Sequence, residues 1–128
     1  MAALAVFLDA NALVPVSLAD ILLRTAEEGL LEPFWSAQVS DEAARAVKLS
    51  RPSADPVSID RRFWQVSAAF PEAMVDTDGM DPSVYPSPHP SDQLVIAAAH
   101  RSLADVIVTR NLSHFPSCRP CVIAGFKP

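Results

Sequence analysis

Asp9 is the first residue of this 128-residue chain whose type and position suggest chemistry. It ends a nearly continuous apolar run from Ala2 to Leu8, and Asn11 follows two residues later. Such a run is typical of a buried strand in a parallel sheet, and ligands of open α/β sheets bind at the carboxyl ends of the strands. Asp9 is therefore a candidate ligand for a metal or a phosphate. The structural alternative is that it caps a turn or the next helix.

Two further places bring polar groups to comparable positions. Asp92 stands in the first turn of a predicted helix, where the helix dipole favours a negative charge, although capping alone would also explain it. The apolar run 104–109 ends on a threonine and is followed by Arg110 and Asn111, so polar residues again follow a predicted strand. Like Asp9, these residues fall at the carboxyl end of a strand.

Four segments with apolar residues at helical spacing predict the helices that position these groups. Ser17, Ser36 and Ser91 are the predicted N-caps of three of them, and Gly29 is the predicted stop of the first. The predicted helices run over 17–29, 37–49, 57–70 and 92–100.

Short apolar segments between the helices predict the remaining strands. Segment 30–36 contains Pro33 and is predicted to be a connection or a very short edge strand. Segments 73–75 and 121–124 are predicted as short strands, and 77–91 as a long proline-rich loop.

The order of these elements predicts the fold class. Short apolar strands alternate with helices, and the crossovers are long enough for parallel pairing. We therefore expect an α/β fold, a three-layer α/β/α sandwich with a short, mainly parallel central sheet, in a single domain spanning residues 1–128. Phe63 and Trp64 are expected in its core.

The composition is that of a globular chain, with 50% hydrophobic and 20% charged residues. No apolar run is long enough to cross a bilayer, and the N-terminus lacks the pattern of a signal peptide, so a cytoplasmic location is expected. A net charge of −5 argues against nucleic-acid binding through bulk positive charge, yet a cluster of metal-binding carboxylates in a nuclease would also make the total negative.

Half of the ten basic residues lie in one stretch, which would suit either an RNA track or a solvated helix face. These are Arg45, Lys48, Arg51, Arg61 and Arg62.

Four segments together resemble the PIN domain family, in particular the bacterial branch that includes VapC-like toxins. They occur in the family's order over almost the whole chain: Phe7–Leu13, Trp35–Glu42, Asp92–Ala99, and Ala104–Asn111 with Phe115. The resemblance implies a ribonuclease that depends on Mg²⁺ or Mn²⁺ held by acidic residues. It also implies an RNA substrate, an antitoxin protein as a partner and a homodimer.

Matching motif by motif implies the site residues. Asp9, Glu42 and Asp92 would be the metal ligands, and Asn111 would join them as a catalytic residue by supporting a carboxylate or a bound water. Thr109 would orient Asp9 from the neighbouring strand end. Asp41 adjoins Glu42, so a one-residue shift of the predicted helix would exchange these two acids.

This residue set suits phosphodiester hydrolysis. A divalent metal neutralises the phosphate charge, lowers the pKa of bound water and orients the attack, and Mg²⁺ prefers oxygen ligands. Close carboxylates repel each other, which should raise the pKa of at least one of them when no metal is bound. Arg45 and Arg110 are candidate phosphate contacts, with surface ion pairing as the alternative.

One departure from the family pattern concerns His114, which stands where many members carry a fourth acid just before the phenylalanine. Histidine is a poor ligand for Mg²⁺, so the site would use one metal, prefer Mn²⁺, or be degenerate. The alternative function is therefore a catalytically degenerate PIN-like module that binds RNA or protein.

Cys118 and Cys121 have the spacing of a redox or metal-binding pair. The pair does not open a helix early in a βαβ unit, and with His114 it gives three ligands, whereas a structural zinc needs four. Two reduced thiols are the default expectation.

Overall fold

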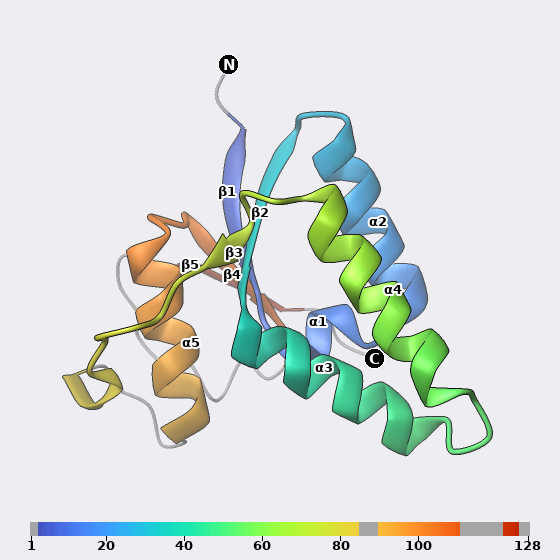
Figure 1. Cartoon of the computed structure of the whole chain (residues 1–128). Helices are drawn as coiled ribbons and strands as arrows, with labels where there is room; N and C mark the ends of the chain where they lie inside the picture. Colours follow the sequence, from blue (N-terminus) through green and yellow to red (C-terminus); the bar gives the residue numbers. More distant parts are fainter. Residues whose placement is uncertain (1–2, 85–89, 111–121, 126–128) are drawn as a thin grey trace.

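Five strands form the central sheet of the computed structural model, which describes residues 3–84, 90–110 and 122–125 (Figure 1). Their order across the sheet is β3-β2-β1-β4-β5, and every pairing is parallel. The strands are β1 (Leu4–Leu8), β2 (Leu31–Ser36), β3 (Met74–Val75), β4 (Val106–Thr109) and β5 (Val122–Gly125).

Strand β1 lies at the centre of the sheet, as its apolar sequence requires. Val6, Phe7 and Leu8 are almost completely buried because neighbouring elements cover both faces of the strand. The chain leaves β1 toward β2 on one side, and β4 later pairs on the other side, so the strand order reverses between β1 and β4. This is the kind of position at which open α/β sheets place their ligands.

Strand β2 lies inside the sheet, so the prediction of a connection or an edge strand at 30–36 was wrong. It pairs with β1 from Leu31 to Phe34, and with β3 only at Trp35 and Ser36. The N–H of Trp35 donates to the carbonyl of Ala73 on the β3 side, and the nitrogen of Pro33, two residues earlier, faces the same side. Pro33 is tolerated there because β3 does not extend that far and no ladder hydrogen bond is lost.

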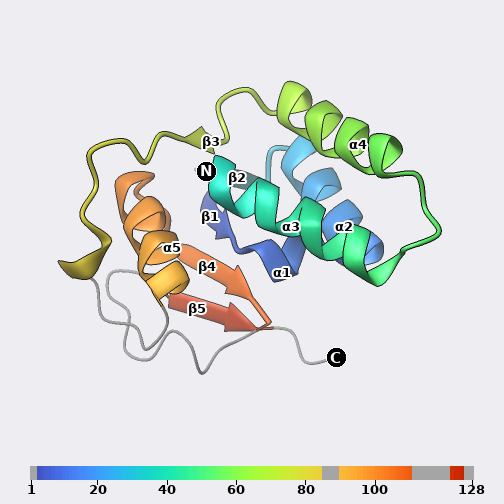
Figure 2. The same ribbon diagram turned by 60° about the horizontal axis from the view of Figure 1, so that its bottom comes forward.

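Helices cover both faces of this sheet, which confirms the predicted α/β/α sandwich (Figures 1 and 2). Helix α5 lies on one side, and α2 and α4 lie on the other. The helices are α1 (Ala10–Leu13), α2 (Val16–Glu27), α3 (Ala37–Ser50), α4 (Pro56–Ala69) and α5 (Pro90–Arg101), with a 3-10 turn at Pro82–Val84. No helix within these described ranges is long and apolar enough to span a membrane.

The helix starts differ from the prediction where proline precedes serine. Ser36 caps α3 as expected, because its Oγ accepts a hydrogen bond from the N–H of Val39 at 3.2 Å. Ser17 and Ser91 are not caps, since α2 begins at Val16 and α5 begins at Pro90. Pro90 is the first residue of α5, a position that the fixed φ of proline favours, whereas Pro15 is itself the N-cap of α2.

Helix α4 also corrects one prediction about the core. Phe63 packs against the core as expected, together with Val66 of the same helix and Phe70 at its C-cap, but Trp64 is 70% exposed. The residues that face α2 and α3 recur three and four positions apart, and Trp64 falls on the opposite side of the helix.

Two short connections bring helix starts to the carboxyl edge of the sheet. Ser36 is both the last residue of β2 and the cap of α3, so α3 begins where β2 ends. Helix α5 ends at Arg101, and β4 begins at Val106, so the helix runs antiparallel to this strand and its N-terminus lies at the strand's carboxyl end (Figure 1). The first turns of α3 and α5 therefore lie at the edge where β1 and β4 end.

Candidate active site

Asp9 lies at the carboxyl end of β1 and is 5% exposed. Its Oδ1 accepts a hydrogen bond of 2.8 Å from the N–H of Ala10, so the predicted capping role is present, at the start of α1. Its Oδ2 accepts a hydrogen bond of 2.8 Å from the hydroxyl of Thr109 at the end of β4. Both carboxylate oxygens of Asp9 are therefore engaged with the chain ends that they join, which sets the direction of the carboxylate.

The register between β1 and β4 sets this contact. Leu8 is level with Val108, and the N–H of Asp9 donates to the carbonyl of Val108 at 3.1 Å, so Asp9 and Thr109 come next on adjacent strands. Both residues are buried, which keeps the carboxylate in a fixed orientation.

Asn11 joins the same edge, although the sequence analysis assigned it no role. Its Oδ1 accepts hydrogen bonds from the backbone N–H of Arg110 at 2.8 Å and from Thr109 Oγ1 at 3.3 Å. The hydroxyl of Thr109 has one proton, and its bond to the carboxylate of Asp9 is the shorter one. Asn11 thus connects the first turn after β1 to the end of β4.

Glu42 lies in the second turn of α3 and shares an electrostatic environment with the other two acids. Burial is the largest cause that raises the pKa of Glu42 above its ordinary value of 4.5, and the charge of Asp9 follows. A hydrogen bond from Gln38 opposes this rise in pKa, the charge of Asp92 adds to it, and Arg45 opposes it. Opposing carboxylates must lie close to produce such repulsion.

The side chains also separate Glu42 from its neighbour. Asp41 is exposed, whereas Glu42 is partly buried and faces the charges of Asp9 and Asp92. The helix orientation therefore turns Glu42, and not Asp41, toward the strand ends.

Asp92 lies in the first turn of α5 and is 8% exposed. The antiparallel course of α5 brings this turn to the carboxyl edge of the sheet, where its charge reaches Glu42. The predicted acids from three separate segments are thus brought toward one place. Asn111 and His114, as well as Cys118 and Cys121, lie outside the described residues.

The donor chemistry of these acids fits Mg²⁺ or Mn²⁺, but they do not form a complete cage. Within 3–84, 90–110 and 122–125, no three His, Cys, Asp or Glu side chains form a group that could hold a metal ion. Mg²⁺ commonly keeps several waters and uses one or two protein carboxylates, so a complete cage is not required. Asp9, Glu42 and Asp92 are the carboxylates that could supply such ligands.

Four of the basic residues divide into two groups by their contacts. Lys48 forms an ion pair of 2.8 Å with Asp60, and Arg62 lies 4.0 Å from Asp20, so these two cations are engaged with acids of the same chain. Arg45 and Arg110 are exposed, and no carboxylate among the described residues lies within ion-pair distance of either one. Their charges remain available near Glu42 and Thr109.

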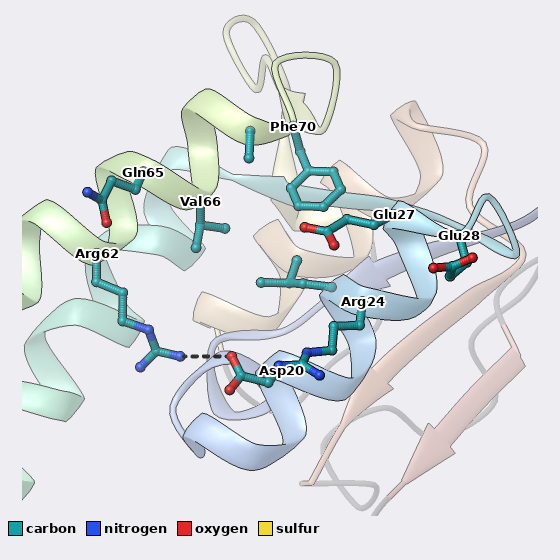
Figure 3. A pocket seen from close by; sticks show the side chains of 10 residues that line it. Asp20, Arg24, Glu27, Glu28, Arg62, Gln65, Val66 and Phe70 are labelled. Carbon is teal, nitrogen blue, oxygen red and sulfur yellow. Dashed lines mark ion pairs between the residues drawn. The ribbon is translucent and has the colours of Figure 1, made fainter.

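A separate groove lies between α2 and α4 (Figure 3). Its volume is about 620 Å³, and the Arg62–Asp20 pair crosses it. Apolar and charged side chains line it, among them Leu23, Val66, Phe70, Arg24 and Glu27, but not Asp9, Glu42 or Asp92. The groove is therefore a different surface from the acidic site.

Comparison with known protein families identifies a match. The family model described as the PIN domain matches residues 5–113, which include all three acids as well as Thr109 and Asn111. No curated protein and no solved structure matches the chain.

Proposed function

This chain belongs to the PIN domain family, and we propose that it is a Mg²⁺- or Mn²⁺-dependent ribonuclease that hydrolyses RNA phosphodiester bonds. PIN domains are generally nucleases, which supports hydrolysis of a phosphodiester as the reaction class. The observation that carries the proposal is the placement of three acids at one edge of the sheet: Asp9 is held there by Thr109, Asp92 is buried in the first turn of α5, and Glu42 lies within reach of both charges. Burial first, and then these charges, raise the pKa of Glu42. A divalent cation bound among these carboxylates would relieve their repulsion.

Each side chain would have a distinct task in this reaction. Asp9, Glu42 and Asp92 would bind the metal, which, when present, neutralises the phosphate charge and activates water for attack. Thr109 would hold Asp9 in one orientation through their 2.8 Å hydrogen bond. Asn111 would support a carboxylate or a water from the segment after β4.

Arg45 and Arg110 would contact RNA phosphates on either side of the acids. Arg45 lies three residues after Glu42 on α3, close enough for its charge to act on that carboxylate. Arg110 directly follows Thr109, and its backbone is held by Asn11. These exposed cations would offset the repulsion between an acidic protein and its acidic substrate.

The cellular role that we propose is that of a toxin in a toxin–antitoxin pair, in the cytoplasm. It is supported by the motif resemblance to VapC-like toxins, which also implies an antitoxin protein and a homodimer as partners. Light scattering of the purified chain at several concentrations would test the dimer, since a monomer mass throughout would reject it.

The second candidate is a degenerate PIN-like module that binds RNA or protein without cutting. His114, which stands where many members of the family carry a fourth acid, favours it. The two functions differ in one outcome, which is the cleavage of RNA.

An RNA cleavage assay tests the enzyme proposal. We expect the wild type to cut members of a panel of structured RNAs with Mg²⁺ or Mn²⁺ and to stop when EDTA is added. Asp92→Asn should lose cleavage, whereas Asp41→Asn, the same change at an exposed acid, should retain it. Intact RNA in every condition, with RNA binding preserved, would instead support the degenerate module.

A further inference from the structure

Gln38 is a side chain beside the acidic site that neither the motifs nor the proposed mechanism uses. It lies in the first turn of α3, four residues before Glu42, so the two side chains are neighbours on one helix face. Its Nε2 donates a hydrogen bond of 3.3 Å to Glu42 Oε1. Its Oε1 is buried and has no hydrogen-bond partner within the part of the chain that the structure describes.

The orientation of the Gln38 amide follows from its neighbour. An ionised carboxylate only accepts hydrogen bonds, so the NH₂ group of the amide must face Glu42. Rotating the amide by 180° would set its oxygen against the carboxylate and remove the hydrogen bond from Nε2 to Glu42. The buried oxygen therefore stays on the side away from Glu42 Oε1, where it requires a donor.

We propose that Gln38 is a positioning residue of the metal site, whose amide holds Glu42 and accepts a hydrogen bond from a water of the hydrated divalent cation. This inference rests on the proposed metal-dependent function. Mg²⁺ and Mn²⁺ retain waters when few protein ligands bind them, and such waters are strong hydrogen-bond donors. The buried Oε1, next to a carboxylate ligand, is an acceptor suited to one of them.

The alternative role for Gln38 is purely structural, and the two roles predict different results. A structural amide would affect the stability of the metal-free protein and leave the affinity for the cation unchanged. A positioning amide would change the affinity and the surroundings of the bound ion, because partners of metal ligands typically alter affinity by about 10–100-fold.

Titration of Mn²⁺ into the full chain tests the proposal, with Gln38→Met and Gln38→Leu as variants and Gln65→Met as the matched control. Gln65 is exposed on α4, so the control makes the same chemical change away from the acids. We expect Mn²⁺ affinity to fall by about 10-fold or more in both Gln38 variants. The electron paramagnetic resonance spectrum of bound Mn²⁺ should also change, while the control matches wild type in both measurements.

Two outcomes would overturn the inference in distinguishable ways. If wild type binds Mn²⁺ and both Gln38 variants bind it within twofold, with an unchanged spectrum, Gln38 has no role at the site and the metal-dependent function stands. If wild type does not bind Mn²⁺ at all, the metal-dependent function fails and the role of Gln38 fails with it. The melting temperature of the metal-free variants identifies any loss of folding.

Discussion

Thr109 and Asp9 form a buried hydrogen bond of 2.8 Å across the two central strands, although 100 residues separate them in the sequence. This contact joins the end of β4 to the end of β1, on either side of the place where the strand order reverses. It fixes the carboxylate that the account places at the centre of metal binding.

Thr109→Val tests this contact, because valine keeps the shape of threonine and removes the hydroxyl. We expect Mn²⁺ affinity and RNA cleavage to fall by about 10–100-fold, and the free energy of unfolding to fall by about 1–3 kcal/mol. Thr25→Val is the control, since the hydroxyl of Thr25 donates to the carbonyl of Ile21 within its own helix. Equal cleavage by the two variants would show that the Thr109 hydroxyl does not serve the site.

The neighbours Glu42 and Asp41 allow a test of which acid on α3 serves the site. Glu42→Gln should abolish measurable Mn²⁺ binding and cleavage, because it removes the carboxylate that faces Asp9 and Asp92. Asp41→Asn should leave both within about twofold, since that side chain is exposed. Calorimetric titration of each variant gives the comparison, and the reverse pattern would mean that Asp41 is the ligand.

The raised pKa of Glu42 predicts how the stability of the metal-free protein depends on pH. Above pH 4.5 the Glu42 carboxyl tends to keep its proton in the folded state, whereas it loses the proton in the unfolded chain. The contribution of Glu42 to the free energy of unfolding therefore falls as pH rises from 4.5 through the folded pKa. Glu42→Gln removes the effect. Urea unfolding in the presence of EDTA measures this difference. We expect the variant to be more stable than wild type at pH 7 and equal to it at pH 4. A variant that is less stable than wild type at pH 7 would show that the ionised Glu42 stabilises the fold.

Leu103 offers a test of local strain away from the site. Its φ of 59° lies in the left-handed region, and its side chain is 80% exposed after the last turn of α5. Leu103→Gly should raise the free energy of unfolding by about 0.5–1 kcal/mol, because relief of strain exceeds the entropic cost of glycine.

Leu49→Gly is the matched control for this change. Leu49 is also exposed, at 78%, but it lies within α3, where glycine should lower stability by up to about 1 kcal/mol. Chemical denaturation measures both, and a lower stability of Leu103→Gly would contradict the proposed strain.

Much of the fold could be predicted because short sequence features determine where several strands and helices begin and end. The apolar run before Asp9 required a buried strand, and Gly29 stopped α2 because its φ of 78° suits glycine. The interior position of β2 could not be predicted, since Pro33 is tolerated there only because β3 is short. Trp64 was placed in the core on its type alone, although its side chain is largely exposed.

The candidate site was predictable to a different degree for each residue. The place of Asp9 followed from one strand, and the charges of Asp9 and Asp92 both act on Glu42. That these three acids are metal ligands stays a prediction from the resemblance. Asn11 and Gln38 were missed as site neighbours, because their contacts depend on strand register and on the burial of one helix face. Neither property is visible in a short stretch of sequence.

Calorimetric titration of Mn²⁺ and Mg²⁺ into wild type and into the Asp9→Asn, Asp92→Asn double variant decides whether these acids bind a catalytic metal, with RNA cleavage measured on the same samples. We expect wild type to bind the cations and cleave RNA, and the double variant to lose both together. Wild type that binds neither ion and leaves structured RNAs intact would contradict it and would favour the binding module.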